Sequence, residues 1–143
     1  MPLEKGVKAA EVSNLLRTRR RNKAPGNDSI SNEFLTAMGE PMAKAIAMLT
    51  EACWLLEHYP QRFKQARTIV LRKLGKASYE DPGAWRPIAL LNTIGKIIEA
   101  LTALRIKTAA EERGLLLETQ MGARIRKSID TAVELLTKQI HTV

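Results

Sequence analysis

The chain contains 143 residues, a length that predicts one domain because most domains hold roughly 100–200 residues. Apolar residues make up 45% of it and charged residues 27%, which excludes a wholly disordered chain, a collagen-like repeat and a disulfide scaffold. Lysine and arginine number 23 against 15 aspartates and glutamates, and the net charge of +8 favours a polyanionic partner, either nucleic acid or an anionic membrane surface.

The cellular compartment of the protein is indicated by features that are absent from the sequence. Cys53 is the single cysteine and cannot form an internal disulfide, which favours a reducing environment. The first residues show no apolar run of a signal peptide, and no stretch of about 18 uncharged apolar residues offers a membrane span. We therefore expect an intracellular protein, or a piece of one, that does not use a membrane.

Three helices are predicted in the first part of the chain, over residues 8–21, 32–38 and 42–58. Ser29 or Ser31 can cap the second helix, and a glycine and a proline at 39 and 41 separate it from the third. In the third helix apolar side chains recur at steps of four and three. This spacing predicts one buried stripe, formed by Met42, Ile46, Leu49, Cys53 and Leu56.

After the third predicted helix the spacing of the apolar residues is no longer helical, and the new pattern predicts a β-hairpin. Residues 67–73 contain a short β-branched run and read as a strand, and residues 85–90 read as a second strand. Pro87 confines that second strand to an edge, or itself to the start of the strand, since proline cannot donate a ladder hydrogen bond. A polar loop over residues 75–83 joins the two strands.

Helical spacing returns from Thr93, and Gly114 stands where a C-terminal cap belongs. The apolar face of this helix is formed by Ile94, Ile97, Ile98, Leu101 and Leu104. Ser128 can cap a last helix, with Asp130 in its first turn and a core face formed by Val133, Leu136 and Ile140. The expected fold class is α+β and mostly α-helical, with helices around a small antiparallel β-hairpin.

Basic residues gather in three clusters, over residues 17–23, 62–76 and 124–127. No acidic residue lies between Arg62 and Lys76. Solvated helix faces and loops are one interpretation of such clusters. Because all three carry little compensating acid, they favour contacts with the phosphates of a nucleic acid.

Catalytic chemistry is poorly supported by the residues themselves. The chain has three aspartates, at positions 28, 81 and 130, and each has a local explanation in a loop, a turn or a helix N-terminus. Glu111 and Glu112 lie near a helix end and are expected to be solvated. The two histidines are far apart in sequence, and with a single cysteine they offer no metal-ligand spacing. These residues alone predict a basic binding domain without an active site and without a metal site.

Several short motifs follow one another in a characteristic order. Residues 23–30 read KAPGNDSI, residues 73–76 read KLGK, residues 85–92 read WRPIALLN, and residues 120–124 read QMGAR. Tyr59-Pro60 before FKQA, and GKIIE over residues 95–99, fall between them. In this order the chain resembles the reverse transcriptases of non-LTR (LINE-like) retrotransposons, whose corresponding motifs are KAPGPDGI, KPGK, YRPISLLN and QFGFRPGRST. The resemblance covers about residues 10–143.

The resemblance implies that residues 1–143 form a single partial domain, the fingers of a right-hand polymerase without its palm and thumb. The family's catalytic aspartates lie in the palm, and neither of their motifs occurs in this sequence. The full enzyme would copy an RNA template onto a DNA primer, using deoxynucleotide triphosphates and Mg²⁺. This fragment is expected to bind no cofactor and to be inactive alone. Self-association through the surface that lacks its palm, and a nuclear location, are further expectations.

Site residues follow by position from the same resemblance. The resemblance implies that Arg67 and Lys73 contact the triphosphate of the incoming nucleotide. The alternation of side chains supports this, since both are odd-numbered in one strand and would share a face. Arg86 is grouped with them, although it could instead hold the hairpin or touch the template. Template contacts are expected from Lys23, Gln120, Gly122 and Arg124.

Departures from the family motifs leave two other interpretations open. Asn27, Ser29 and Leu74 replace prolines and a glycine that form turns in the family motifs. Residues 125–127 and Ile129 also differ from the family pattern. Such losses are typical of a divergent subfamily or of a decaying copy. The alternatives to a reverse transcriptase fragment are therefore a non-catalytic nucleic-acid-binding module and a nonfunctional retrotransposon remnant.

Overall fold

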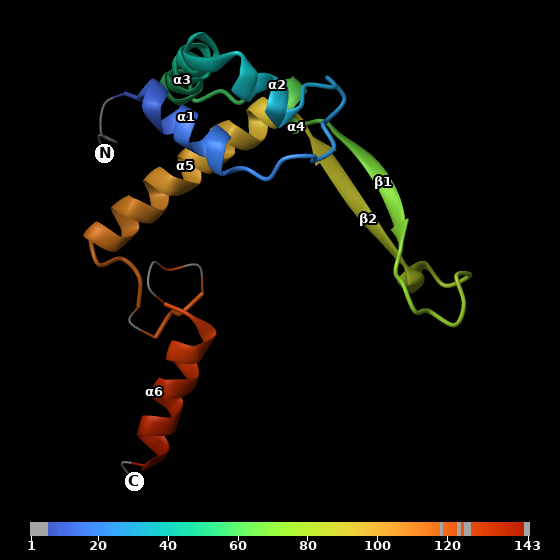
Figure 1. Cartoon of the computed structure of the whole chain (residues 1–143). Helices are drawn as coiled ribbons and strands as arrows, with labels where there is room; N and C mark the ends of the chain where they lie inside the picture. Colours follow the sequence, from blue (N-terminus) through green and yellow to red (C-terminus); the bar gives the residue numbers. More distant parts are fainter. Residues whose placement is uncertain (1–5, 118, 123, 125–126, 142–143) are drawn as a thin grey trace. The chain divides into compact units, whose positions relative to one another are not determined.

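The computed structural model describes residues 6–117, 119–122, 124 and 127–141 (Figure 1). Helices predominate in it, and one antiparallel pair of strands completes an α+β fold, as predicted from the sequence. The helices and strands are α1 (Ala9–Thr18), α2 (Asn32–Ala37), α3 (Gly39–Leu55), α4 (Gln61–Lys64), β1 (Ala66–Arg72), η1 (Pro82–Ala84), β2 (Trp85–Leu91), α5 (Thr93–Glu112) and α6 (Ile129–His141). The chain divides into two compact units, residues 1–101 and residues 102–143.

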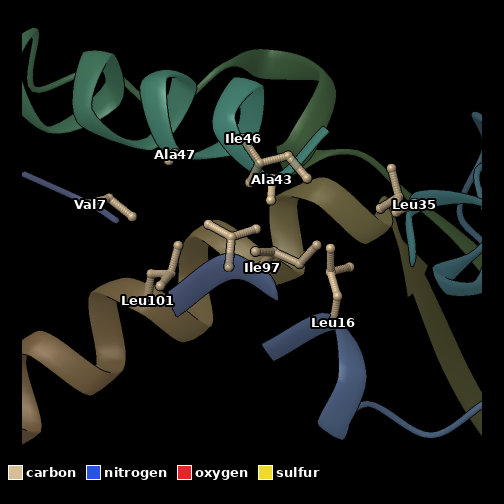
Figure 2. Packing of buried hydrophobic residues seen from close by; sticks show 9 residues of the cluster. Val7, Leu16, Leu35, Ala43, Ile46, Ala47, Ile97 and Leu101 are labelled. Atoms are coloured by element: carbon tan, nitrogen blue, oxygen red, sulfur yellow. The ribbon is translucent and has the colours of Figure 1, made fainter. Parts of the chain in front are cut away.

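The core of the first unit lies between α1, α3 and the beginning of α5 (Figure 2). Ile97 and Leu101 of α5 meet Leu16 of α1 and Ile46 of α3, and Leu35 adds the short α2 to the same cluster. These side chains are almost fully removed from water. Their burial against one another is what holds three separate helices on the first half of α5.

The first helix is shorter than predicted. It begins after Lys8, whose backbone N–H donates to Oε2 of Glu11 at 2.8 Å, and it ends at Thr18. Arg19 already has an extended backbone with ψ of 141°, so the basic run over residues 19–23 lies in a loop and not in the helix. The predicted helix over residues 8–21 was therefore too long at its C-terminal end.

The predicted stripe of α3 is partly wrong. Ile46 and Cys53 are buried as expected, and Met42 packs half-buried against the core. The other buried positions, however, are Ala43, Ala47 and Thr50. Leu56 follows the last residue of the helix and is exposed. Small side chains face the core here because α1 approaches α3 closely, and large ones would leave no room for it. The helix also begins earlier than predicted, at Gly39, whose φ of +63° turns the chain out of α2.

The hairpin is confirmed close to its predicted limits. Strand β1 pairs antiparallel with β2 from Ala66 opposite Leu91 to Arg72 opposite Trp85, and both strands run away from the helices of the first unit (Figure 1). Pro87 lies opposite Val70, which a sheet of two strands tolerates because every strand is an edge.

Three parts of the first unit meet where α5 begins. The hydroxyl of Thr93 donates to the carbonyl oxygen of Ile30 at 2.7 Å, and Nδ2 of Asn92 donates to the carbonyl oxygen of Arg62 at 3.3 Å. The backbone of Gly95 lies so close to Phe63 that an added Cβ would come within 2.9 Å of the phenylalanine Cβ. The start of α5 therefore ties the loop before α2, the short α4 and the hairpin together.

The second unit is built from the end of α5, a loop and α6. Gly114, with φ of +60°, ends α5 as predicted, and the N–H of Leu115 donates back to the carbonyl oxygen of Ala110 at 2.9 Å. The hydroxyl of Ser128 caps α6 by accepting from the N–H of Thr131 at 3.2 Å. The expected core face of α6 is exposed, however, at Val133, Leu136 and Ile140, so this part of the prediction was wrong for the described residues.

Candidate nucleic-acid interface

One face of the hairpin carries two of the predicted cations. Directly opposite residues in an antiparallel pair share a face, and side chains alternate along each strand. Arg67 lies opposite Leu90, and Arg86 lies opposite Leu71. The pair formed by Ile69 and Ile88 stands between them on the same face. The face is therefore aliphatic in its middle, with an arginine toward each end.

Lys73 lies one residue beyond the end of β1, near Arg86. Its Nζ donates to the carbonyl oxygen of Gly83 at 2.8 Å, and its backbone N–H donates to the carbonyl oxygen of Ala84 at 2.8 Å. Lys73 stands six positions after Arg67, which is about 20 Å along an extended strand. Lys73 and Arg86 thus belong to the far end of the hairpin, and Arg67 belongs to the end nearest the helices.

The far end is braced by an arginine that packs against two aromatic rings, a feature that sequence reasoning missed. The guanidinium carbon of Arg72 lies 5.2 Å from the ring centroid of Tyr79 and 5.2 Å from that of Trp85. The indole N–H of Trp85 donates to the carbonyl oxygen of Tyr79 at 2.9 Å. The Tyr79 hydroxyl donates to the carbonyl oxygen of Lys73 at 3.1 Å. The sequence did contain a signal for this feature, because two of the six aromatic residues of the chain, Tyr79 and Trp85, lie in or next to one polar loop.

A groove of about 630 Å³ lies in the first unit, between the hairpin face and the loop that follows α1. It is lined by Arg19, Arg20, Lys23, Ala24, Asn32, Ile69, Leu71, Ile88, Ala89, Leu90, Thr93 and Lys96. Four of these residues are cations, and none of the described residues that line the groove is acidic. The structure thus places Lys23, a predicted template contact, beside the hairpin. Sequence reasoning missed Lys96, which lies 73 residues away from Lys23 in the chain.

Arg19 anchors the inner side of this groove. Its Nη2 donates to the carbonyl oxygen of Lys96 at 2.7 Å, which joins the loop after α1 to the first turn of α5. Burial lowers the pKa of Arg19 below its ordinary value, and the nearby Glu99 carboxylate opposes that shift. Two buried polar atoms of the lining, Nε of Arg19 and Oδ1 of Asn32, have no hydrogen-bond partner among the described residues. The first turn of α5 adds the positive end of a helix dipole beside them.

The remaining predicted template residues lie in the second unit. Gln120 and Gly122 are exposed in the loop before α6, and nothing lies within 4 Å of a Cβ built on Gly122. Arg124 makes a bidentate ion pair with Glu111, with Nη2 to Oε2 at 2.7 Å and Nε to Oε1 at 3.0 Å. The expectation that Glu111 is solvated was therefore wrong. The hydrogen bonds from Arg124 hold the pKa of the Glu111 carboxyl below its usual range.

The carboxylates of two predicted loops serve local structure. Oδ1 of Asp28 accepts from the N–H of Ile30 at 3.1 Å, and Oδ1 of Asp81 accepts from the N–H of Gly83 at 2.8 Å. Among the described residues no three histidine, cysteine, aspartate or glutamate side chains come together, so these residues do not fit a metal centre. None of the described helices combines the length and the apolar character that a membrane span requires. Arg126, part of the third basic cluster, lies outside the described residues.

Comparison with known proteins shows which proteins this chain is similar to. The chain is 33% identical over 132 residues to a probable RNA-directed DNA polymerase from the transposon X-element of Drosophila melanogaster, an alignment that covers 92% of this chain and 14% of that protein. It is also 33% identical over 105 residues to the retrovirus-related Pol polyprotein from the type-1 retrotransposable element R1 of Bradysia coprophila, covering 73% of this chain and 10% of that protein. The chain is therefore similar, over most of its length, to RNA-directed DNA polymerases of non-LTR retrotransposons. The resemblance seen in the motifs is confirmed.

A third member of the family extends the alignment along the chain. The probable RNA-directed DNA polymerase from transposon BS of Drosophila melanogaster is 30% identical over 136 residues, which covers 95% of this chain and 15% of that protein. No family model matches the chain. The chain spans between 10% and 15% of the length of these three relatives.

Proposed function

We propose that this chain is the fingers portion of a non-LTR retrotransposon reverse transcriptase and supplies contacts to the template and to the incoming nucleotide. The observation that carries the proposal is the groove, whose described lining combines four cations with no acid. Such a surface suits the phosphates of a nucleic acid strand, because uncompensated cations attract them and release their counterions.

In the first unit the contacts divide along the hairpin. Lys73 and Arg86, at the far end, contact the phosphates of the incoming deoxynucleotide triphosphate, Arg as a planar fork and Lys as a point charge. Arg67 contacts a separate phosphate, because about 20 Å of strand separates it from Lys73. Lys23 follows the template backbone from the groove.

In the second unit we propose template contacts from Gln120, Gly122 and Arg124. Arg124 also donates from Nη1 to the carbonyl oxygen of Leu117 at 2.8 Å, so the guanidinium is held between Glu111 and Leu117. A side chain that is already held in place loses less conformational entropy when it contacts a strand.

The wider assignments follow from the family. The full enzyme uses Mg²⁺, an RNA template and a DNA primer, and the described residues of this chain offer no cluster of side chains that could hold the metal. We expect the isolated chain to extend no primer in the presence of Mg²⁺ or Mn²⁺. We place the protein inside the cell, with the nucleus as its expected compartment.

The experiment is a titration of the 143-residue chain with single-stranded RNA and DNA at several salt concentrations. Neutralising about 4–6 phosphates predicts a slope of log K against log salt of about −3 to −4. Lys23→Ala should make the slope shallower by about 0.7, the value expected for one lost single-strand contact. Lys44→Ala is the matched control, because Lys44 is exposed on α3 and paired with Glu40 at 2.8 Å, away from the groove. A flat salt response would contradict the proposal.

A non-catalytic binding module is the second candidate, favoured by the lack of a cluster of metal-ligating side chains among the described residues. The coding sequence that follows codon 143 distinguishes the two. An open frame that encodes both aspartate motifs of the palm supports the enzyme. An immediate stop codon supports the module or a remnant.

A further inference from the structure

The groove has two chemically different parts. Its rim is cationic, with Arg20 and Lys23 exposed on one side and Lys96 on the first turn of α5. Its floor is the aliphatic face of the hairpin, formed by Ile69, Leu71, Ile88 and Leu90. A surface that served phosphates alone would have no use for an aliphatic floor, and a ligand that fits both parts must join an anion to an apolar, flat or compact group.

From this juxtaposition we infer that the groove binds one unpaired nucleotide of a single strand, with its base against the aliphatic floor and its phosphates at the cationic rim. The inference rests on the proposed function and deepens it, since it names what the groove takes from the strand. A volume of about 630 Å³ lies inside the range of roughly 300–1,000 Å³ that small-molecule sites occupy. A base that is stacked in a duplex cannot contact this floor, because its neighbours cover both of its faces. The site therefore selects single strands.

The polar groups of the lining predict little preference for one base over another. The hydroxyl of Thr93 is engaged with the carbonyl oxygen of Ile30, and Nδ2 of Asn32 is engaged with that of Leu16 at 3.3 Å. Oδ1 of Asn32 has no partner, but the residue is only 7% exposed. Every base can pack its flat face against aliphatic side chains, as it can stack on an aromatic ring. Such packing does not distinguish the hydrogen-bonding edges of the bases.

A matched pair of substitutions on the hairpin tests the inference. Ile88→Asp places a carboxylate on the floor of the groove, while Val70→Asp places one on the opposite face of the same hairpin, at a residue that does not line the groove. Both side chains are partly exposed, at 39% and 56%, and both changes alter the net charge equally. Ile88→Asp should weaken binding of a 12-residue oligouridylate about tenfold or more, and Val70→Asp less than about threefold.

The role of the base is tested with an oligomer of the same length that carries abasic sites. This oligomer should bind the unmodified chain about tenfold more weakly, and Ile88→Asp should weaken it little further. If both variants bind oligouridylate equally well, or if the abasic oligomer binds as tightly as oligouridylate, the groove holds no base and the inference fails while the proposed function stands. If the unmodified chain binds no single strand at all, both fail.

A second measurement does not depend on the stability of the variants. Oligouridylate that contains 4-thiouridine crosslinks on irradiation to the residues that its base touches. Crosslinks on Ile69, Leu71, Ile88 or Leu90 support the inference. Crosslinks confined to residues 74–83 at the far end of the hairpin overturn it.

Discussion

The backbone of Gly26 lies directly against Asn92. A Cβ built on Gly26 would come within 2.7 Å of the backbone nitrogen of Asn92 and 2.8 Å of its Cα, closer than real Cβ atoms approach. Gly26 belongs to the KAPGNDSI motif and Asn92 to the WRPIALLN motif, 66 residues apart in the sequence. Two of the motifs that identify the family are therefore in contact, and the contact holds the loop that carries Lys23 beside the end of β2.

Because that contact has no room for a side chain, Gly26→Ala should destabilise the first unit. Forcing a methyl group into a packed position costs about 1–3 kcal/mol, which lowers the melting temperature by roughly 5–10 °C in a chain of this size. Thermal unfolding followed by circular dichroism measures the change. Gly122→Ala is the control, since nothing lies within 4 Å of a Cβ at that position. Equal melting temperatures for the two variants would show that Gly26 is not under this constraint.

Local signals in the sequence were sufficient for most elements of the fold. Ser31 accepts from the N–H of Phe34 at 3.2 Å and caps α2, and Gly114 ends α5, as their residue types predicted. The face of α3 was not predictable in the same way. Which residues a helix buries depends on how closely its neighbour approaches, and here Ala43 and Ala47 admit α1.

The alternation of side chains along one strand predicts that Arg67 and Lys73 share a face. That Arg86 lies on the same face as Arg67 became visible only with the register of the two strands. The groove itself required the tertiary structure, because Arg19 and Lys96 meet only when the loop after α1 lies against the first turn of α5. No spacing in the sequence encodes a contact between residues that lie 77 positions apart.

The brace at the far end of the hairpin predicts the effect of Arg72→Leu. The substitution removes contacts with both Tyr79 and Trp85, each of a kind that contributes about 0.5–1 kcal/mol at exposed sites. We expect faster hydrogen exchange at the Lys73 N–H, which donates to Ala84 beside the brace, with the exchange of α3 unchanged. Arg67→Leu at the other end of the strand is the control and should leave Lys73 protected. Unchanged exchange in both variants would show that the aromatic rings do not need Arg72.

The ion pair between Arg124 and Glu111 predicts a pH dependence for the second unit. The pKa of Glu111 is lowered in the folded chain, so its contribution is complete above the ordinary range of a glutamate carboxyl and is lost as the pH falls through the lower folded value. Glu111→Gln should therefore destabilise residues 102–141 at about pH 7 and have little effect at about pH 3. Hydrogen exchange of the described amides of this unit measures the difference.

The neighbouring Glu112→Gln is the matched control for that experiment, because Arg124 pairs with Glu111. It should change exchange little at either pH. A loss of protection that is the same at both pH values would mean that Glu111 acts through packing and not through its charge.

Helix α6 predicts weak self-association of the chain. Ile129, Val133, Leu136 and Ile140 recur at steps of four, three and four residues and are all exposed, so they form one apolar stripe along the helix. Burying about 400 Å² of such surface contributes roughly 10 kcal/mol before the cost of association is subtracted, and that cost is of similar size. Oligomers should therefore form at high concentration and dissociate on dilution, which sedimentation at several concentrations measures.

Leu136→Glu should abolish this association, because it places a charge in the middle of the stripe. Leu74→Glu is the control: Leu74 is even more exposed, at 96%, but lies alone in the hairpin loop, so the same substitution should leave association unchanged. Equal loss in both variants would point to net charge as the cause, since each change adds one negative charge to a basic chain. A chain that sediments as a clean monomer at every concentration and melts sharply above about 60 °C would contradict the expectation that this surface needs a partner.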